Sequence, residues 1–495
     1  MHKVIQFIKT RPLFLLLLPF FFFLHILNEN FAPVLFNDCF LLILAGMAMS
    51  LCLYGLFFLF YKNSRKAALL SFFIIAFVLF FGSMYDFVLA KMGRIFLLKY
   101  TVIIPAFLLV TLLIAVYLKR TRRTLLRIVF YLNSLLLLLT LWELFIAGNK
   151  SLNLRPIHTA DISQQLNTCD TCSKPDIYLI VADEYAGAQE LKDLFSFDNS
   201  AFEQQLESRG FHITHNSFSN YNATVYSMAS ALNMGYLESL NTTMISHKDM
   251  FNCQEQIRKN QLTAFLQTQG YDIINHSFFD LGNKDKLVSI PFFPKKRDIF
   301  LAQTLFGHME KHLGFHWATD EKIEAIRKVH YINNNIIDSS TSAGLRSKKQ
   351  KPVFTYTHLA LPHNPYFYDS TGNKIPVSLL TDEYKYRKEA YIQYLVYANK
   401  QFLRLIDNIL ANSTRPPVIV LISDHGFRQF NEPTDKKYYF MTLNAVYLPD
   451  KNYKGFYNGM SNVNLFRTIL NAQFGQQLPM LKDSSTFLFE PELDF

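Results

Sequence analysis

DIYLIVADE, residues 176–184, is a run of six apolar residues between Asp176 and a pair of acids, Asp183 and Glu184. A short apolar run that is rich in β-branched side chains and bounded by polar residues is typical of a fully buried β-strand. In open α/β sheets, ligands bind just beyond the carboxyl ends of the strands. The two acids are therefore the first candidates for a functional site.

On both sides of this strand, short apolar runs alternate with amphipathic stretches. Alternating strands and helices predict an α/β sandwich around a largely parallel sheet. We expect further strands at about 211–219, 271–278, 352–361 and 416–424, and helices at about 199–210, 225–233, 254–269, 381–411 and 462–474.

The N-terminal part of the chain is far more apolar than the rest. It holds five stretches that approach the roughly 20 apolar residues needed to span a bilayer. They cover about residues 12–28, 38–61, 68–90, 96–118 and 126–147. We interpret residues 1–147 as a five-helix transmembrane domain, 148–174 as a polar linker and 175–495 as the α/β domain.

The excess of positive charge follows the membrane part. Of 49 Lys and Arg and 39 Asp and Glu residues, residues 1–150 hold 15 basic and 4 acidic ones. The remaining 34 basic and 35 acidic residues nearly cancel, so the net charge of +10 does not indicate nucleic-acid binding. The basic residues gather before the first span, at 62–66 and at 119–127, and the positive-inside rule makes these segments cytoplasmic. Five spans then place the α/β domain outside the cytoplasm.

The cysteines of the outer part suggest an oxidising compartment. Cys169 and Cys172 form a C-x-x-C pair, which is compatible with redox activity, half of a zinc site or a structural disulfide. No second such pair exists, so we favour the disulfide. Cys253 is left without an assignment.

Chemically versatile side chains stand at or beyond the predicted strands. Thr224 begins a predicted helix, His358 and His363 lie within and after the strand at 352–361, and Asp424 and His425 follow the strand at 416–424. Carboxylates and imidazoles together suit Zn²⁺ or Mn²⁺. A hydroxyl beside such an ion is an activated nucleophile. A histidine nearby can bind a substrate oxygen or protonate a leaving group.

Each of these residues also has an ordinary structural interpretation. Thr224 is a favoured type of helix N-cap, and His358 and His363 are compatible with packing or capping roles. Asn222 and Arg428 are candidates for binding substrate oxygens. Asn is, however, common in turns, and an exposed Arg is common on any surface.

The motifs around these residues resemble those of the sulfatase and alkaline phosphatase superfamily. T-V-Y-S-M-A-S (224–230) has the spacing of the sulfatase signature C-x-P-S-R-A-S, with Thr224 at the Cys position. LIVADE, LPHNP (361–365) and SDHG (423–426) look like three further motifs of the group. Several membrane spans followed by such a domain also resemble the layout of lipoteichoic acid synthases and phosphoethanolamine transferases.

The resemblance implies one divalent metal ion held by Asp183, with or without Glu184, and by Thr224, Asp424 and His425. Zn or Mn is favoured, and Mg or Ca is possible. Sulfatases convert the Cys of their motif to formylglycine, a conversion that Thr224 cannot undergo. This departure favours phosphoryl transfer through a phospho-threonine. No His follows His425, so the further His ligand of two-metal phosphatases is missing.

The sequence therefore predicts a membrane-anchored, metal-dependent enzyme of the cell envelope. We expect it to transfer or hydrolyse the phosphoryl group of a phosphodiester, such as a phospholipid head group, on a lipid-linked or envelope glycan substrate. We expect an integral protein of the bacterial plasma membrane with a periplasmic or extracellular catalytic domain. The alternatives are a sulfuric ester hydrolase and a catalytically inactive envelope partner or sensor.

Overall fold

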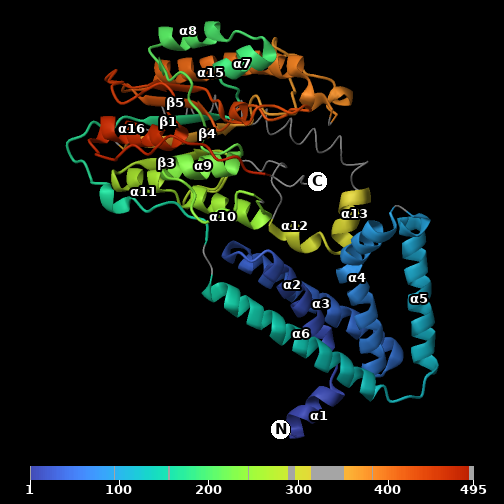
Figure 1. The fold of residues 1–495 in the computed structure, drawn as a ribbon. Coiled ribbons are helices and arrows are strands. Elements are labelled where there is room, and N and C mark those ends of the chain that lie inside the picture. Colours follow the sequence, from blue (N-terminus) through green and yellow to red (C-terminus); the bar gives the residue numbers. More distant parts are fainter. Residues whose placement is uncertain are drawn as a thin grey trace. The chain divides into compact units, whose positions relative to one another are not determined.

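The computed structural model describes residues 2–93, 95–153, 156–243, 245–287, 296–313, 351–381 and 383–489 (Figure 1). The chain divides into two compact units. Of the described residues, those up to 153 and those at 296–313 form the helical unit, and those at 156–287 and 351–489 form the α/β unit.

The α/β unit is built on a six-stranded sheet with the strand order β2-β6-β5-β1-β4-β3. The four strands β5, β1, β4 and β3 are parallel, whereas β6 and β2 add an antiparallel edge. Every residue of β1, β4 and β5 is buried, as expected for strands covered by helices on both faces. The strands are β1 (Ile177–Ala182), β2 (His212–Ile213), β3 (Asp272–His276), β4 (Val353–Leu359), β5 (Val418–Ser423) and β6 (Asn444–Tyr447).

Helices cover both faces of this sheet, with α7, α8 and α15 on one face and α9, α10, α11 and α16 on the other (Figure 1). The predicted α/β sandwich with a largely parallel sheet is therefore confirmed. The helices are α7 (Ala188–Phe195), α8 (Ser200–Ser208), α9 (Thr224–Asn233), α10 (His247–Arg258), α11 (Gln261–Thr268), α15 (Lys388–Asn412) and α16 (Asn462–Phe474). Short 3₁₀ turns lie at η3 (Ser163–Gln165), η4 (Val377–Leu379), η5 (Tyr384–Tyr386) and η6 (Lys436–Phe440).

Two details of the α/β unit differ from the sequence prediction or add to it. The strand expected at 211–219 is reduced to the two residues of β2, and the polar segment that follows is held by a hydrogen bond from Thr214 N–H to the Asn444 carbonyl and by isolated bridges at Phe218. The structure pairs Cys169 with Cys172 in a disulfide and leaves Cys253 as a buried free thiol.

The helical unit contains long apolar helices. The segment Pro33–Tyr61 and the helices α4, α5 and α6 are long and apolar enough to cross a membrane. The elements are α1 (His2–Thr10), α2 (Phe14–Glu29), η1 (Pro33–Leu35), α3 (Phe36–Tyr61), α4 (Ser64–Met92), η2 (Phe96–Leu98), α5 (Tyr100–Arg120), α6 (Leu126–Leu152), α12 (Lys296–Leu301) and α13 (Leu305–Leu313).

The helix α2, formed by the first predicted span, differs from the other four. Its 16 residues correspond to about 24 Å at 1.5 Å per residue, which is shorter than the roughly 30 Å hydrocarbon core of a bilayer. Ten of its residues are buried, whereas α5 buries only Leu118. Four helices rather than five thus reach bilayer length, and α2 packs inside the unit.

With four spans, the basic residues before α2 lie on the side opposite to the segments 62–66 and 119–127, so the orientation rests on these two loops alone. The two basic segments 62–66 and 119–127 lie between α3 and α4 and between α5 and α6. If both loops are cytoplasmic, the chain enters α3 from the non-cytoplasmic side, crosses the membrane four times through α3 to α6, and leaves α6 on the non-cytoplasmic side again. The side of the membrane on which residues 156 onward begin is therefore the same for four spans and for five.

A segment from the middle of the chain also belongs to the helical unit, where it packs on α4 at Gly82. The backbone N–H of Gly82 donates to the carbonyl of Gln303 at 2.8 Å, and Ser83 Oγ donates to Gln303 Oε1 at 2.7 Å. A Cβ at position 82 would lie 2.8 Å from the Gln303 carbonyl oxygen and 2.7 Å from the His308 ring. Only glycine permits this close approach.

We expect Gly82→Ala to lower the thermal stability of the full chain in detergent, by about 1–3 kcal/mol, because the new methyl group must displace the segment that carries Gln303. Gly148→Ala on α6 is the matched control, since nothing lies within 4 Å of a Cβ there. Thermal unfolding and limited proteolysis of both variants are the measurements. Equal behaviour of the two would show that the packing at Gly82 does not hold this segment.

Candidate active site

The carboxyl ends of three neighbouring strands bring the predicted site residues together. β1 lies between β4 and β5, with Val181 opposite His358 and Ala182 opposite Ser423. Asp183 follows Ala182 and Asp424 follows Ser423. The two acids consequently leave the sheet side by side. Both carboxylates are buried, with 3% and 0% of their surface exposed.

Thr224 faces this pair of acids and is the first residue of α9. The N-cap of the helix is Ala223, and no side chain forms a capping hydrogen bond. Thr224 Oγ1 instead lies 3.1 Å from Nε2 of His425 and 3.5 Å from Oδ1 of Asp183. The N-cap interpretation of Thr224 is therefore not what the structure shows.

Asp183, His358 and Asp424 form a group that fits a metal ion. One potential ligand atom from each lies within 4.8 Å of the others, and all three residues are buried. Among the described residues, none forms a hydrogen bond with Asp424 Oδ2 or His358 Nε2. Buried polar atoms without partners are costly, and a divalent cation would satisfy both.

The electrostatics of this group also favour a bound cation. Burial, together with the nearby carboxylates of Asp424 and Glu184, raises the pKa of Asp183 well above its usual value. Burial opposes ionisation of Asp424 too, but the groups around it, which include the backbone N–H of Glu184, lower the pKa of that carboxyl. Without a cation, one of the two acids therefore keeps its proton.

His358 has the orientation and the protonation state of a metal ligand. Its Nδ1 lies 2.8 Å from the hydroxyl of Tyr356, two residues earlier on β4. Burial lowers the pKa of His358 to about 3, so the ring is neutral. A neutral imidazole oriented by a hydrogen bond on its other nitrogen is the usual form of a metal-binding histidine.

Glu184 turns away from this group. Its backbone has a positive φ of 60°, and its Oε1 accepts hydrogen bonds from the backbone N–H of Arg428 and from Gln429 Nε2. Its Oε2 lies 3.7 Å from Nε2 of His363. The structure thus places Glu184 with His363, beside the other candidates and not among the three grouped ligands.

The two predicted substrate-binding residues lie next to each other but have different surroundings. The side-chain amide of Asn222 is bonded on both sides to the backbone of Leu488, which is a structural role. Arg428 is half-buried, and its Nη1 donates to the carbonyl of Asn222 at 3.3 Å.

Several supporting residues were not identified from the sequence. Ser227 Oγ donates to the backbone carbonyl of Asp424 at 2.5 Å, and Tyr356 and Gln429 orient His358 and Glu184. Ser227 is part of the sulfatase-like signature, and its position three residues after Thr224, on the same face of α9, was the available signal. Nothing in the sequence singled out Tyr356 or Gln429.

Comparisons with known proteins give similarities to envelope enzymes. No family model matches the chain, and no curated protein matches it. Among solved structures, it is similar to the periplasmic domain of phosphoethanolamine transferase EptC from Campylobacter jejuni, with 14% identity over 64% of this chain and 95% of that one, at a TM-score of 0.39. Lipoteichoic acid synthase LtaP from Listeria monocytogenes gives 10% identity over 68% and 79% of the two chains, also at a TM-score of 0.39.

A third similar structure is the soluble domain of lipooligosaccharide phosphoethanolamine transferase A from Neisseria meningitidis, with 12% identity over 62% of this chain and 90% of that one, at a TM-score of 0.37. At such identities and TM-scores, the similarity does not extend to this chain's activity or substrate.

We expect Asp183→Asn to raise the stability of the metal-free protein and to abolish its stabilisation by Zn²⁺. The pKa of Asp183 is raised on folding, so the native state loses stability as the pH rises from the unfolded pKa toward the folded one. The side-chain amide of the Asp183→Asn variant cannot ionise, so the variant avoids this loss of stability. It also lacks the carboxylate that would bind the metal ion. Thermal unfolding at neutral pH, after EDTA treatment and with added Zn²⁺, measures both effects.

For the wild type, Zn²⁺ at a hundredfold excess over its Kd should add about 2.7 kcal/mol. His358→Gln should lose the same increment. Asp407→Asn, which changes a carboxylate on α15 that is paired with Arg209 at the surface, is the control and should respond to Zn²⁺ like the wild type. An unchanged response of Asp183→Asn or His358→Gln would exclude this group as the metal site.

Proposed function

We propose that this chain is a membrane-anchored, metal-dependent enzyme that transfers or hydrolyses the phosphoryl group of a phosphodiester, with Thr224 as the nucleophile. The observation that carries the proposal is the position of Thr224 Oγ1. It stands at the start of α9, 3.1 Å from His425 Nε2, next to the buried Asp183–His358–Asp424 group. A hydroxyl at a helix N-terminus can attack an anionic ester that the first turn of the helix binds.

His425 presents a lone pair to Thr224. Its Nδ1 lies 2.8 Å from the carbonyl of Gly426, an acceptor that requires the hydrogen to be on Nδ1. Nε2 is then free to take the Thr224 proton or to bind a metal ion. Both options lead to a more nucleophilic oxygen.

The residues that would hold the metal ion are Asp183, Asp424 and His358, with His425 and Thr224 at the border of the same space. When bound, a divalent ion supplies positive charge that favours the ionised hydroxyl and neutralises the phosphate oxygens. Zn or Mn suits this mixture of carboxylates and imidazoles, and Mg or Ca is less suited to histidine. Compared with the set that the resemblance implied, we add His358 and leave Glu184 outside.

In the first step, Thr224 Oγ1 bonds to phosphorus and the bond to the leaving alcohol oxygen breaks. The proton released by Thr224 passes through His425 Nε2 to the leaving oxygen. In the second step, an acceptor hydroxyl or water attacks phosphorus and loses its proton, the bond to Thr224 breaks, and Oγ1 takes one proton from solvent, which balances the proton that the attacking group releases. His363 is neutral because burial lowers its pKa more than Glu184 raises it, and we propose that it accepts the proton of the attacking group.

We propose a lipid head group or a lipid-linked envelope glycan as the substrate. Four described helices are long and apolar enough to cross a membrane, so the chain shares its compartment with such molecules. The charge of the loops supports an α/β unit on the outer face of a bacterial plasma membrane.

Thr224→Ala should lower phosphodiester turnover at least a thousandfold, because no other described side chain occupies the position of its Oγ1. Thr224→Ser should keep part of the activity. Release of a fluorescent phospholipid head group measures the rate, and mass spectrometry of the intact chain should find a phosphate-bearing adduct that the Ala variant lacks. Ser230→Ala is the control, since Ser230 Oγ bonds only to the carbonyl of Gly235 at the other end of α9.

The same assay separates the alternatives. The spacing of T-V-Y-S-M-A-S also favours a sulfuric ester hydrolase, which would cleave aryl sulfates faster than aryl phosphodiesters. An inactive envelope partner would bind no divalent ion and form no adduct. Full activity of Thr224→Ala would overturn the proposal in any case.

A further inference from the structure

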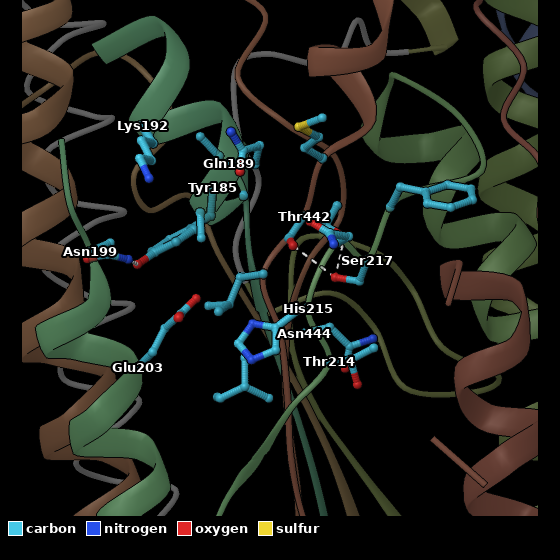
Figure 2. Close-up of a pocket in the computed structure, with 18 of the residues that line it drawn as sticks. Tyr185, Gln189, Lys192, Asn199, Glu203, Thr214, His215, Ser217, Thr442 and Asn444 are labelled. Atoms are coloured by element: carbon cyan, nitrogen blue, oxygen red, sulfur yellow. Dashed lines mark hydrogen bonds between the residues drawn. The ribbon is translucent and has the colours of Figure 1, made fainter. Parts of the chain in front are cut away.

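The α/β unit contains a pocket of about 560 Å³ in addition to the candidate active site (Figure 2). Its wall is made by the segment after β1, by α7 and α8, by the residues after β2 and by the chain that enters β6. The volume lies within the range of about 300–1,000 Å³ that is usual for small-molecule sites. Nothing in the proposed function uses this pocket.

The pocket is separate from the candidate active site, although the two share a loop. Tyr185, Ala186 and Gly187 line the pocket, whereas the carboxylate of Glu184, the preceding residue, lies with His363 and Arg428. Backbone contacts fix the shared wall, since Gly187 N–H donates to the Met441 carbonyl at 3.1 Å. Asp183, Thr224, His358 and Asp424 are not among the lining residues.

Buried polar groups in the pocket wall have no partners. Asn444, on β6, is 1% exposed, and neither its amide nitrogen nor its amide oxygen has a hydrogen bond to any residue that the structure describes. Thr214, 2% exposed, has an Oγ1 without a partner. Leaving such groups unpaired costs about 1–3 kcal/mol each. A ligand that enters beside them would recover part of this loss.

The charges in the pocket nearly cancel. Figure 2 shows the ammonium group of Lys192 and the carboxylate of Glu203 pointing into the space from α7 and α8. Lys437 and Asp198 are the other charged lining residues, and Asp198 is already bonded to the N–H of Ser200. A lining with both signs of charge favours neither an anion nor a cation.

We infer that this pocket binds a neutral, hydroxyl-rich ligand of the saccharide class. The unpaired set contains a donor, an acceptor and a hydroxyl that can serve as either. A phosphate accepts only and an ammonium group donates only, so each would leave part of the set unpaired. Sugar hydroxyls do both. Tyr185, Phe218 and Phe440 add apolar surface for the faces of a sugar ring. The inference holds whether or not Thr224 is a nucleophile.

The test is binding of neutral disaccharides to the full chain, purified in an amine-oxide detergent that carries no sugar. The disaccharides contain no phosphodiester and no sulfate ester, so their binding is measured without turnover, in the wild type and in Thr224→Ala alike, and does not depend on the proposed function. The probes are maltose, cellobiose and di-N-acetylchitobiose, with dimethyl phosphate, which only accepts, and methylammonium, which only donates, as charged comparators. Saturation-transfer NMR detects binding, and calorimetry gives its Kd. We expect at least one disaccharide to bind, and the charged probes to bind at least tenfold more weakly.

Two variants assign the binding to this pocket. Asn444→Leu should weaken disaccharide binding at least tenfold while leaving thermal stability unchanged or higher, because an unpaired amide is replaced by an apolar group of similar shape. Asn464→Leu is the matched control, since this buried amide is fully bonded and its loss should destabilise the fold. Glu203→Gln, at the half-buried wall, should also weaken binding at least tenfold.

Three results would each overturn the inference. These are the absence of binding by every disaccharide, tighter binding of a charged probe, and disaccharide binding that survives both Asn444→Leu and Glu203→Gln. The last outcome would place the sugar elsewhere on the protein.

Discussion

The burial of two carboxylates at the ends of adjacent parallel strands is the constraint on which the α/β unit depends. Asp183 and Asp424 are buried and repel each other when both are ionised, so neighbouring groups must compensate. The backbone N–H groups of Glu184 and His425 donate to Asp424 Oδ1 at 3.0 and 2.9 Å, and Ser227 holds the carbonyl of the same residue. The turn after β5 packs closely only because Gly426 lacks a Cβ, which would contact the Tyr438 carbonyl and lie 2.8 Å from Glu190 Oε2. These contacts stabilise the ionised form of Asp424. The charge of Asp183 must be removed by a proton or compensated by a cation.

The location of the candidate site was predictable because it follows from topology. Parallel strands end at the same edge of a sheet, so polar residues after DIYLIVA and after PPVIVLIS had to meet once both runs were identified as strands. The atoms that face one another were not predictable. Asp183 and Glu184 are neighbours of the same chemical type, and only the left-handed backbone at Glu184 separates their roles. His358 lies within β4, and its direction depends on Tyr356.

The missed elements are those that depend on distant parts of the chain. β6 has four residues and pairs with β5 antiparallel, so neither its length nor its pattern distinguished it from a loop. α2 is apolar like a membrane span, but the helices packed around it decide that it lies inside the helical unit. The segment 296–313 joins that unit because Gly82 on α4 leaves room for its backbone. Local periodicity contains no information on any of these contacts.

The loop from Glu184 to Gly187 joins two sites that have opposite electrostatic character. On one side it donates the Glu184 N–H to Asp424, within a group that requires a cation or a proton. On the other side its residues line a pocket whose charges nearly cancel and whose unpaired groups are an amide and a hydroxyl. A metal ion has no reason to enter the pocket, and a neutral sugar cannot compensate the buried carboxylates. Because the loop is anchored to both Asp424 and Met441, a ligand that shifts its backbone in the pocket must also strain the hydrogen bond that helps to keep Asp424 ionised.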